Sequence, residues 1–270
     1  MELVVDNQNS RILHRQKGLK PFSAAAVPLK RPHSIVYNPF DSLYYVADTD
    51  GHRIVAFDRF DTPRQLTSTS IIAGTNLSRP HDIALDPVTG WLYSLNPRLT
   101  TVFRFKGLGK QESRLDLSAH LSYARGLSVV NGRLYVIGSS QGKVVEIMDF
   151  DKGLYKIYQS PGKVEISPAG NWERTGLVLN DVEYFQQNWY ATAYFCPAVS
   201  LPGQDYNKNK LIRFKTWKHF ETGEWEDLSH QLPDKLVPYY LTVHEDNLYI
   251  PLFNHQAPGK GDCIYRLSKH

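Results

Sequence analysis

Two histidines stand in nearly identical surroundings in the first third of the chain. His33 lies in Arg-Pro-His-Ser-Ile, and His81 lies further along in Arg-Pro-His-Asp-Ile. An imidazole can move a proton near neutral pH, and its unprotonated nitrogen binds divalent metals. We therefore expect His33 and His81 to act as catalytic groups, as ligands of one divalent metal ion, zinc or calcium, or as both.

The two histidine segments belong to a longer repeat. Each is followed by an apolar strand, a turn, a strand that contains tyrosine, and a third strand, over residues 31–58 and 79–105. Weaker copies begin at Arg125, Asn180 and Tyr239. The distance from one copy to the next is close to the length of a four-stranded β-propeller blade. The sequence predicts an all-β fold, a single β-propeller domain over residues 1–270.

The number of blades depends on how the two ends of the chain are interpreted. Residues 4–13 match residues 46–55 at a constant offset, which predicts an N-terminal blade without its innermost strand. The last blade, residues 237–270, is also short, with three strands. This count gives six blades with incomplete terminal blades. A five-bladed ring is the alternative, in which residues near 21–28 supply the outer strand of the last blade.

The start of each repeat defines a set of five positions that we call the anchor residues. The first strand of a propeller blade lines the central channel, so the residue before it is expected at the channel mouth. The anchor residues would then form one ring of polar side chains, joined by the residues that follow two of them. These candidate site residues are His33, His81, Arg125, Asn180 and Tyr239, with Asp181 and Tyr240 beside them.

Each remaining candidate has a chemical role that its side chain could fill. Arg125 could hold a carboxylate or phosphate of a substrate, or form a structural ion pair with Asp181. Asn180 or Asp181 could offer an oxygen to the metal or to the substrate, and Tyr239 or Tyr240 could transfer a proton. The alternative is that the histidines at the blade entrances only hydrogen-bond to neighbouring backbone.

The segment from Pro32 to Phe57, with Ala47-Asp48 before a short loop and Arg53-Ile54 after it, resembles an NHL repeat. Within the NHL-repeat propellers, the chain is most similar to the peptidyl-α-hydroxyglycine amidating lyases. In those lyases Pro-His-Ser and Pro-His-Asp segments at blade entrances supply histidines that bind a catalytic zinc. The resemblance implies His33 and His81 as zinc ligands, and it implies that Asp48 ties the loop of its repeat.

Composition narrows the list of partners and compartments. The 31 basic and 27 acidic residues are spread along the chain, with a net charge of +4 and no run of like charges, so we expect no nucleic-acid partner. Apolar stretches such as residues 24–27 are too short to span a membrane, and no nucleotide-binding motif occurs. The N-terminus lacks a secretory signal, which predicts a cytoplasmic protein or a mature chain. Cys196 and Cys263 are most simply two buried thiols, although they could form one disulfide.

Two classes of function fit these observations. The first is a small-molecule enzyme, with metal-assisted lyase, hydrolase or isomerase chemistry at the anchor residues. The second is a non-catalytic propeller that binds a protein or another ligand, because fold alone does not determine function.

Overall fold

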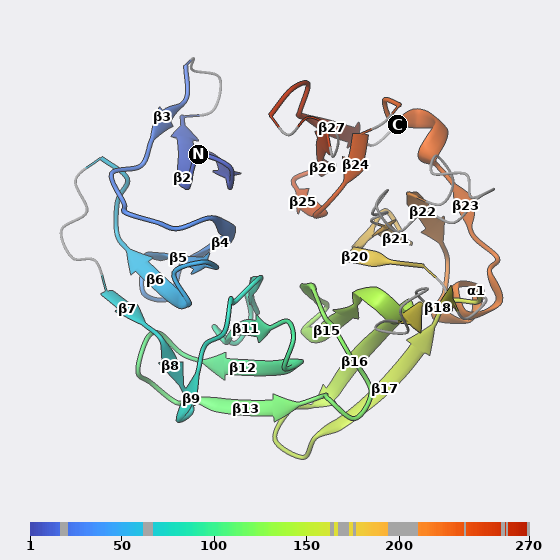
Figure 1. Ribbon diagram of the computed structural model, residues 1–270, viewed down its shortest axis with the longest axis horizontal. Coiled ribbons are helices and arrows are strands. Elements are labelled where there is room, and N and C mark those ends of the chain that lie inside the picture. The colour runs from blue at the N-terminus through green and yellow to red at the C-terminus, as the bar shows by residue number, and fades with distance from the viewer. Residues whose placement is uncertain are drawn as a thin grey trace. The chain divides into compact units, whose positions relative to one another are not determined.

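The computed structural model describes residues 1–16, 21–61, 67–162, 165–166, 173–174, 177–193, 210–234, 236–254, 257 and 259–268. These residues form two compact units, residues 1–120 and residues 121–270, and β-strands account for most of their regular structure (Figure 1). Among the described residues, no helix is long and apolar enough to cross a membrane.

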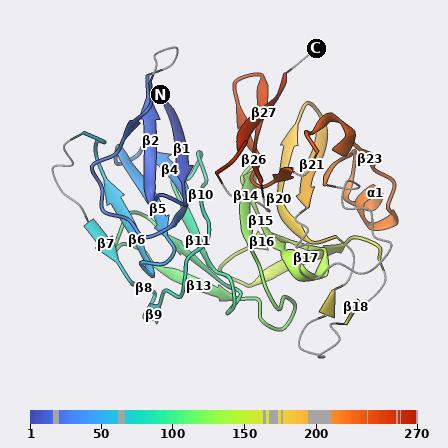
Figure 2. The same ribbon diagram turned by 45° about the horizontal axis from the view of Figure 1, so that its top comes forward.

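The first unit contains three antiparallel sheets in chain order. Their strands are β1 (Glu2–Asp6), β2 (Arg11–Arg15) and β3 (Ser23–Ala24); β4 (Pro32–Asn38), β5 (Leu43–Asp48), β6 (Arg53–Phe57) and β7 (Thr67–Thr69); and β10 (Ile83–Leu85), β11 (Leu92–Asn96), β12 (Thr101–Phe105) and β13 (Ser113–Asp116). A small hairpin, β8 (Ile71–Ile72) and β9 (Thr75–Asn76), precedes the third sheet. Figure 2 shows β1 and β2 beside β4 and β5.

The first sheet lacks the innermost strand of its repeat, as the sequence predicted. The match of residues 4–13 to residues 46–55 carries β2 onto β6, and it carries β1 onto β5 with a slight shift at its start. Among the described residues of this sheet, no strand corresponds to β4. Residues 23–24 form β3, which pairs with β2. The five-bladed alternative, in which residues near 21–28 complete the last blade, is therefore wrong.

The second strand of each repeat is apolar on both faces because it lies between two neighbouring sheets. Val46 packs toward the first sheet against Ile12, whereas Tyr45 and Ala47 pack toward the third sheet in a cluster with Phe103. All of these side chains are buried. Full burial of a large apolar side chain contributes roughly 1.5–3 kcal/mol, so stacking of the sheets holds the unit together.

The second unit repeats this plan with three more sheets. Their strands are β14 (Gly126–Val130), β15 (Arg133–Gly138), β16 (Lys143–Asp149) and β17 (Leu154–Gln159); β20 (Leu179–Phe185), β21 (Asn188–Ala193), β22 (Leu211–Phe214) and β23 (Glu226–Asp227); and β24 (Leu236–Pro238), β25 (Thr242–His244), β26 (Asn247–Asn254) and β27 (Cys263–Ser268). A hairpin of β18 (Glu165–Ile166) and β19 (Glu173–Arg174), the helix α1 (Trp217–Thr222) and two 3₁₀ turns, Ser139–Gln141 and Ser229–Gln231, complete the described elements.

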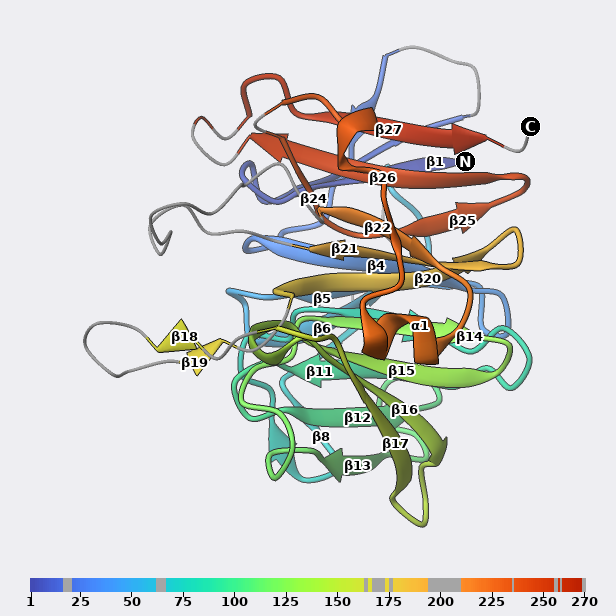
Figure 3. The ribbon, with the colours of Figure 1, turned by 90° about the vertical axis from the view of Figure 1, so that its right-hand side faces the viewer.

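The last sheet has three strand positions, in agreement with the prediction of a short final blade. Both β24 and β25 pair with β26, the first near its end and the second near its start (Figure 3). They are two pieces of one inner strand, interrupted at residues 239–241. β27 pairs with the other edge of β26. Cys263, in β27, is exposed, so the prediction of two buried thiols is wrong for this residue; Cys196 lies outside the described residues.

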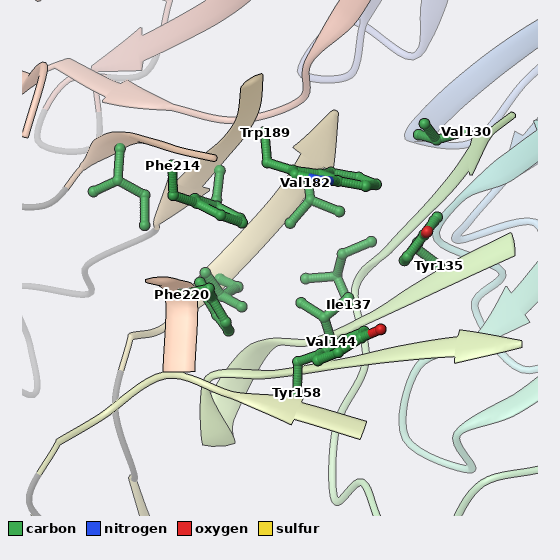
Figure 4. Close-up of a cluster of buried hydrophobic side chains, with 12 residues drawn as sticks. Val130, Tyr135, Ile137, Val144, Tyr158, Val182, Trp189, Phe214 and Phe220 are labelled. Carbon is green, nitrogen blue, oxygen red and sulfur yellow. The ribbon is translucent and has the colours of Figure 1, made fainter. Parts of the chain in front are cut away.

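An aromatic cluster forms the core between the first two sheets of the second unit (Figure 4). Tyr135 of β15 and Trp189 of β21 meet edge to face, with ring centroids 4.9 Å apart. Trp217 of α1 stacks on Tyr158 at 4.5 Å. Helix α1 is therefore part of the packing between these sheets, although the repeat did not predict a helix there.

Candidate functional site

Each anchor residue lies at or beside an irregularity of its sheet. In the second sheet the register shifts between Pro32 and Ser34, which leaves His33 as one extra residue opposite β5. The same shift between Leu179 and Asp181 leaves Asn180 extra. A β-bulge of this kind interrupts the alternation of side chains and gives the extra residue a new direction.

The backbone hydrogen bonds show the same one-residue shift at the other anchor residues. The amide of His81 donates to Leu95 O at 3.2 Å, whereas the register of β10 would place Asp82 opposite Leu95. The amide of Arg125 donates to Ile137 O at 2.9 Å, although Gly126 is the register partner of Ile137. In the last sheet one extra residue lies within the interruption that contains Tyr239.

The structure brings His33 and His81 into direct contact. Their ring centroids are 4.2 Å apart and the ring planes are tilted by 40°. His81 is 6% exposed and His33 is half-buried. His33 is the second residue of β4, and His81 lies two residues before β10, which contacts β4, so equivalent positions of two repeats meet at one point of the first unit.

Three groups surround Nδ1 of His33. The hydroxyl oxygen of Thr49 lies 2.8 Å away, Arg31 O lies 3.1 Å away, and Nδ2 of Asn7 lies 3.2 Å away. The Thr49 hydroxyl donates to Pro80 O at 2.7 Å, immediately before His81. The backbone and side chains around His33 therefore fix the orientation of its ring.

Two carboxylates of the histidine repeats, Asp48 and Asp82, have structural partners. Asp48 accepts hydrogen bonds from the amide of Lys30 at 2.5 Å and from Nε of Arg53 at 2.7 Å. It therefore ties the loop of its repeat, as expected. Asp82 accepts from the amide of Ile83 at 2.8 Å.

The donor set of the first unit can be compared with what metals require. Imidazole nitrogens suit zinc, whereas calcium takes oxygen ligands, so the pair fits zinc better than calcium. Among the described residues no group of three or more histidine, cysteine or acidic side chains gathers at one place. The pair could offer two nitrogen ligands, fewer than the three protein ligands that catalytic zinc commonly has.

The anchor residues of the second unit form a different arrangement. The guanidinium of Arg125 lies over the rings of Tyr123 and Tyr239, 5.5 and 5.9 Å from their centroids, and its Nη1 is 3.5 Å from Oδ1 of Asn180. Burial works against the charge of Arg125. The neighbouring phenol groups, chiefly those of Tyr239 and Tyr123, nevertheless hold its pKa above the ordinary value.

Asn180 and Asp181 connect neighbouring sheets. Asn180 is fully buried and donates from Nδ2 to Pro238 O at 2.8 Å. The carboxylate of Asp181 accepts from Ser128 Oγ at 2.9 Å, and from the amides of Val182 and Leu241, both at 2.8 Å. These contacts join the three sheets of the unit. The Asp181 carboxylate thus has Ser128, Val182 and Leu241 as partners, whereas the sequence had suggested an ion pair with Arg125.

Gly126 shows how closely two of these sheets approach. A Cβ atom added at this position would lie 2.5 Å from Asn180 O, closer than real contacts allow. A glycine at this anchor-adjacent position therefore lets β14 and β20 pack together.

The tyrosines of the last sheet are half-buried. Tyr239 meets Tyr240 and Phe253 edge to face, with centroids 4.7 and 5.6 Å apart, and its carbonyl accepts from Thr192 Oγ1 at 2.5 Å. Because His33 and His81 belong to the first unit and the other candidates to the second, the ring of five anchor residues stays a prediction.

Sequence reasoning missed two features of these units. The first is Thr49, which lies at the centre of the hydrogen bonds around His33. Its only signal in the sequence was its position directly after Asp48, which matches the position of Asn7 after Asp6 in the preceding repeat. Glu183 in β20 carries a carboxyl group whose pKa is raised to about 7 by burial. An acidic residue inside an apolar strand was the signal for that second feature.

Six successive antiparallel sheets of one repeating plan define the chain as a β-propeller with incomplete terminal blades. Solved structures agree. Virginiamycin B lyase from Staphylococcus aureus is 13% identical with a TM-score of 0.65, covering 99% of this chain and 76% of that one. A catalytically inactive form of that lyase with quinupristin is 12% identical with a TM-score of 0.61, covering 98% and 83%. A chain of the nidogen/laminin complex is 15% identical with a TM-score of 0.57, covering 94% and 92%.

At these identities the similarity shows the fold and does not extend to the function. No protein-family model matches the chain, and no curated protein matches it.

Proposed function

We propose that the protein is a small-molecule enzyme with the His33–His81 pair as its chemical centre, carrying out lyase, hydrolase or isomerase chemistry. The observation that carries this proposal is the contact of the two rings at 4.2 Å. Two imidazoles that approach this closely cannot both hold a positive charge without strong repulsion. One ring is thereby kept neutral, as a general base requires.

The proposed reaction begins with proton removal. The unprotonated nitrogen of one imidazole takes a proton from a carbon next to an electron-withdrawing group, or from water. The electron pair that this releases then expels a leaving group, forms a new double bond or attacks a carbonyl carbon. Return of the proton to the leaving group or to another carbon atom restores the base. General base catalysis of this kind typically contributes about 10²–10⁴-fold to the rate.

A divalent metal, zinc rather than calcium, is the proposed aid to this chemistry. His33 and His81 would hold it through imidazole nitrogens. When bound, zinc polarises a carbonyl and lowers the pKa of water.

The second unit supplies the proposed substrate contacts. Arg125 would bind a carboxylate or phosphate, with Asn180, Asp181 and Tyr240 beside it, and Tyr239 would move a proton. A small molecule, rather than nucleic acid or a membrane, is the proposed partner, and no nucleotide cofactor is invoked. The compartment, cytoplasmic or that of a mature exported chain, stays a prediction.

The finer family assignment is also a proposal. We infer that the repeats are of the NHL type, on the segment from Pro32 to Phe57. The similarity to amidating lyases supports a lyase reaction and the metal role of the two histidines. Arg125, Asn180 and Tyr239 stand where further histidines would strengthen that assignment.

Metal analysis and turnover measurements test the proposal together. Purified protein is analysed for zinc, and it is assayed with p-nitrophenyl acetate and with quinupristin, the compound named with one structural neighbour. Mass spectrometry separates the reactions, because the products of elimination keep the total mass and those of hydrolysis gain one water. We expect His33→Ala and His81→Ala to abolish turnover and zinc binding. Full activity in both variants would reject the assignment.

A binding module is the second candidate function, and the nidogen/laminin neighbour favours it because that propeller occurs in a protein complex. Under this alternative the two histidines would stabilise the fold and nothing more. If His33→Ala has the same unfolding midpoint and the same turnover as wild type, the pair has neither a catalytic nor a stabilising role.

A further inference from the structure

We propose that Thr49 is a positioning residue that fixes the tautomer of His33, with the proton on Nδ1 and the lone pair on Nε2. The assignment of the tautomer rests on hydrogen-bond geometry alone. Its consequence for chemistry rests on the proposed function, because it decides which nitrogen of His33 can take a proton or bind a metal.

The direction of each hydrogen bond follows from the donors available. The hydroxyl of Thr49 has one hydrogen, and the carbonyl of Pro80, 2.7 Å away, can only accept it. The hydroxyl oxygen of Thr49 therefore faces Nδ1 of His33, at 2.8 Å, as an acceptor. The bond is complete only if Nδ1 carries the proton.

A second acceptor points to the same tautomer. Arg31 O lies 3.1 Å from Nδ1 of His33 and has no hydrogen to give. An unprotonated Nδ1 would place its lone pair against two oxygen atoms, with no bond to either of them. A protonated Nδ1 donates to both, mainly to the nearer Thr49.

The amide of Asn7 is a nearby group that could favour the opposite tautomer. Its Nδ2 is 3.2 Å from Nδ1 of His33, a longer distance than that to Thr49. The same nitrogen donates to Pro32 O at 2.9 Å. The carbonyl bond alone explains the position of Asn7, so the two oxygen acceptors decide the tautomer.

The same kind of hydrogen bond occurs at equivalent positions of two repeats. Asn7 and Thr49 occupy equivalent positions of the repeat, and each donates to the carbonyl of the proline that precedes a histidine, Pro32 or Pro80. Thr49 is only 1% exposed, so water does not replace its hydrogen bonds. The third repeat has Pro97 at this position, which has no side-chain donor.

The arrangement couples the two histidines. The Thr49 hydroxyl group orients the His33 ring, and it also donates a hydrogen bond to the carbonyl of Pro80, the residue before His81. With the proton on Nδ1, the lone pair of His33 lies on Nε2, the tautomer that metal sites fix through a partner of the other ring nitrogen.

The test uses selectively ¹⁵N-histidine-labelled full-length protein and long-range ¹H–¹⁵N correlation spectra at pH 8.5, with His33→Gln to assign the signals. Wild type and Thr49→Ser should show His33 with Nδ1 protonated and Nε2 unprotonated. Thr49→Val, which keeps the shape and removes the hydroxyl, should lose this preference. Asn7→Ala should retain it.

The proposal is overturned if wild-type His33 carries its proton on Nε2, if Thr49→Val leaves the tautomer unchanged, or if Asn7→Ala abolishes it. Should Thr49→Val not fold, the wild-type, Thr49→Ser and Asn7→Ala spectra still decide. Zinc affinity gives a second measurement, in which Thr49→Val should weaken binding by about 10–100-fold. If the tautomer is as stated but His33→Ala affects neither zinc binding nor turnover, the proposed function fails and the Thr49 assignment stands.

Discussion

The anchor residues of the two units occupy the same place in the repeat but have different surroundings. In the first unit, His33 and His81 touch each other, and Nδ1 of His33 faces one hydroxyl group, one backbone carbonyl and one side-chain amide. In the second unit, Asn180 and the neighbouring Asp181 donate to or accept from groups on adjacent sheets. A bulge at the start of the inner strand can therefore present a side chain for chemistry or use it to join sheets.

The difference follows from side-chain type. A carboxylate or amide has several hydrogen-bonding sites and can meet backbone amides and carbonyls of two sheets at once. An imidazole has two, so when the scaffold fixes one nitrogen, the chemistry of the ring depends on the other. The comparison predicts that substitutions of His33 and His81 change chemistry, whereas those of Asn180 and Asp181 change stability.

The largest effect is expected at the histidine pair. His81→Ala should lower the turnover found for wild type by at least about 100-fold, because it removes half of the proposed base. The measurement is kcat/KM, with unfolding in urea to confirm that the variant is folded. His244→Ala, at an exposed position of β25, is the matched control and should be unchanged. Equal losses in both variants would contradict the role of the pair.

The next effect concerns the joining of sheets in the second unit. Asp181→Asn replaces one acceptor oxygen by an amide group, which would face either Ser128 and Val182 in place of Oδ1 or Leu241 in place of Oδ2. We expect a loss of about 2–3 kcal/mol in the free energy of unfolding, since buried hydrogen bonds to a charged group are broken. Urea denaturation measures it, with exposed Asp234→Asn as control. A loss below that of the control would show that Asp181 does not join the sheets.

Glu183 gives the second unit a pH dependence of its own. Burial raises the pKa of this carboxyl group from its ordinary 4.5 to about 7 in the folded protein. Its contribution to stability is therefore fully present below about pH 4.5 and is lost as the pH rises toward 7. Glu183→Gln should remove this loss and stabilise the protein by about 1–2 kcal/mol at pH 8, with little change at pH 4.5. A gain that is equal at both pH values would contradict this account.

The smallest effect is expected at Tyr239. Tyr239→Phe keeps the ring contacts with Tyr240 and Phe253 and removes only the hydroxyl group. We expect a change in unfolding free energy below about 1 kcal/mol and a fall in turnover of less than about 10-fold. Unchanged turnover would contradict the proposed proton transfer by Tyr239, whereas a larger fall at unchanged stability would contradict the expectation that the histidine pair dominates the chemistry.

The sheets were predictable from the sequence because each repeat has apolar residues and turn residues at the same positions. The match of residues 4–13 to residues 46–55 located β1 and β2 without any structural information, and it also predicted that their inner strand is lacking. The bulges were not predictable, since register depends on how two strands pair and not on either strand alone. Helix α1 was missed because it is short and packs through Trp217 into the aromatic cluster.

The site was predictable only in part, for a related reason. The shared Pro-His pattern indicated that His33 and His81 are equivalent, and equivalence in adjacent sheets brings them together. Thr49 was not identified because a threonine after Asp48 looks like an ordinary loop residue until its two hydrogen bonds are seen. Cys263 was expected to be buried, but it begins β27, whose residues are exposed or half-buried.

The account is tested most directly by anomalous diffraction at the zinc absorption edge from crystals grown with zinc chloride. It predicts one strong peak about 2.0–2.1 Å from an imidazole nitrogen of both His33 and His81, and the loss of that peak in His81→Ala crystals. Peaks only at other histidines, such as His244, or no peak at the pair, would contradict the claim that these two residues form one centre.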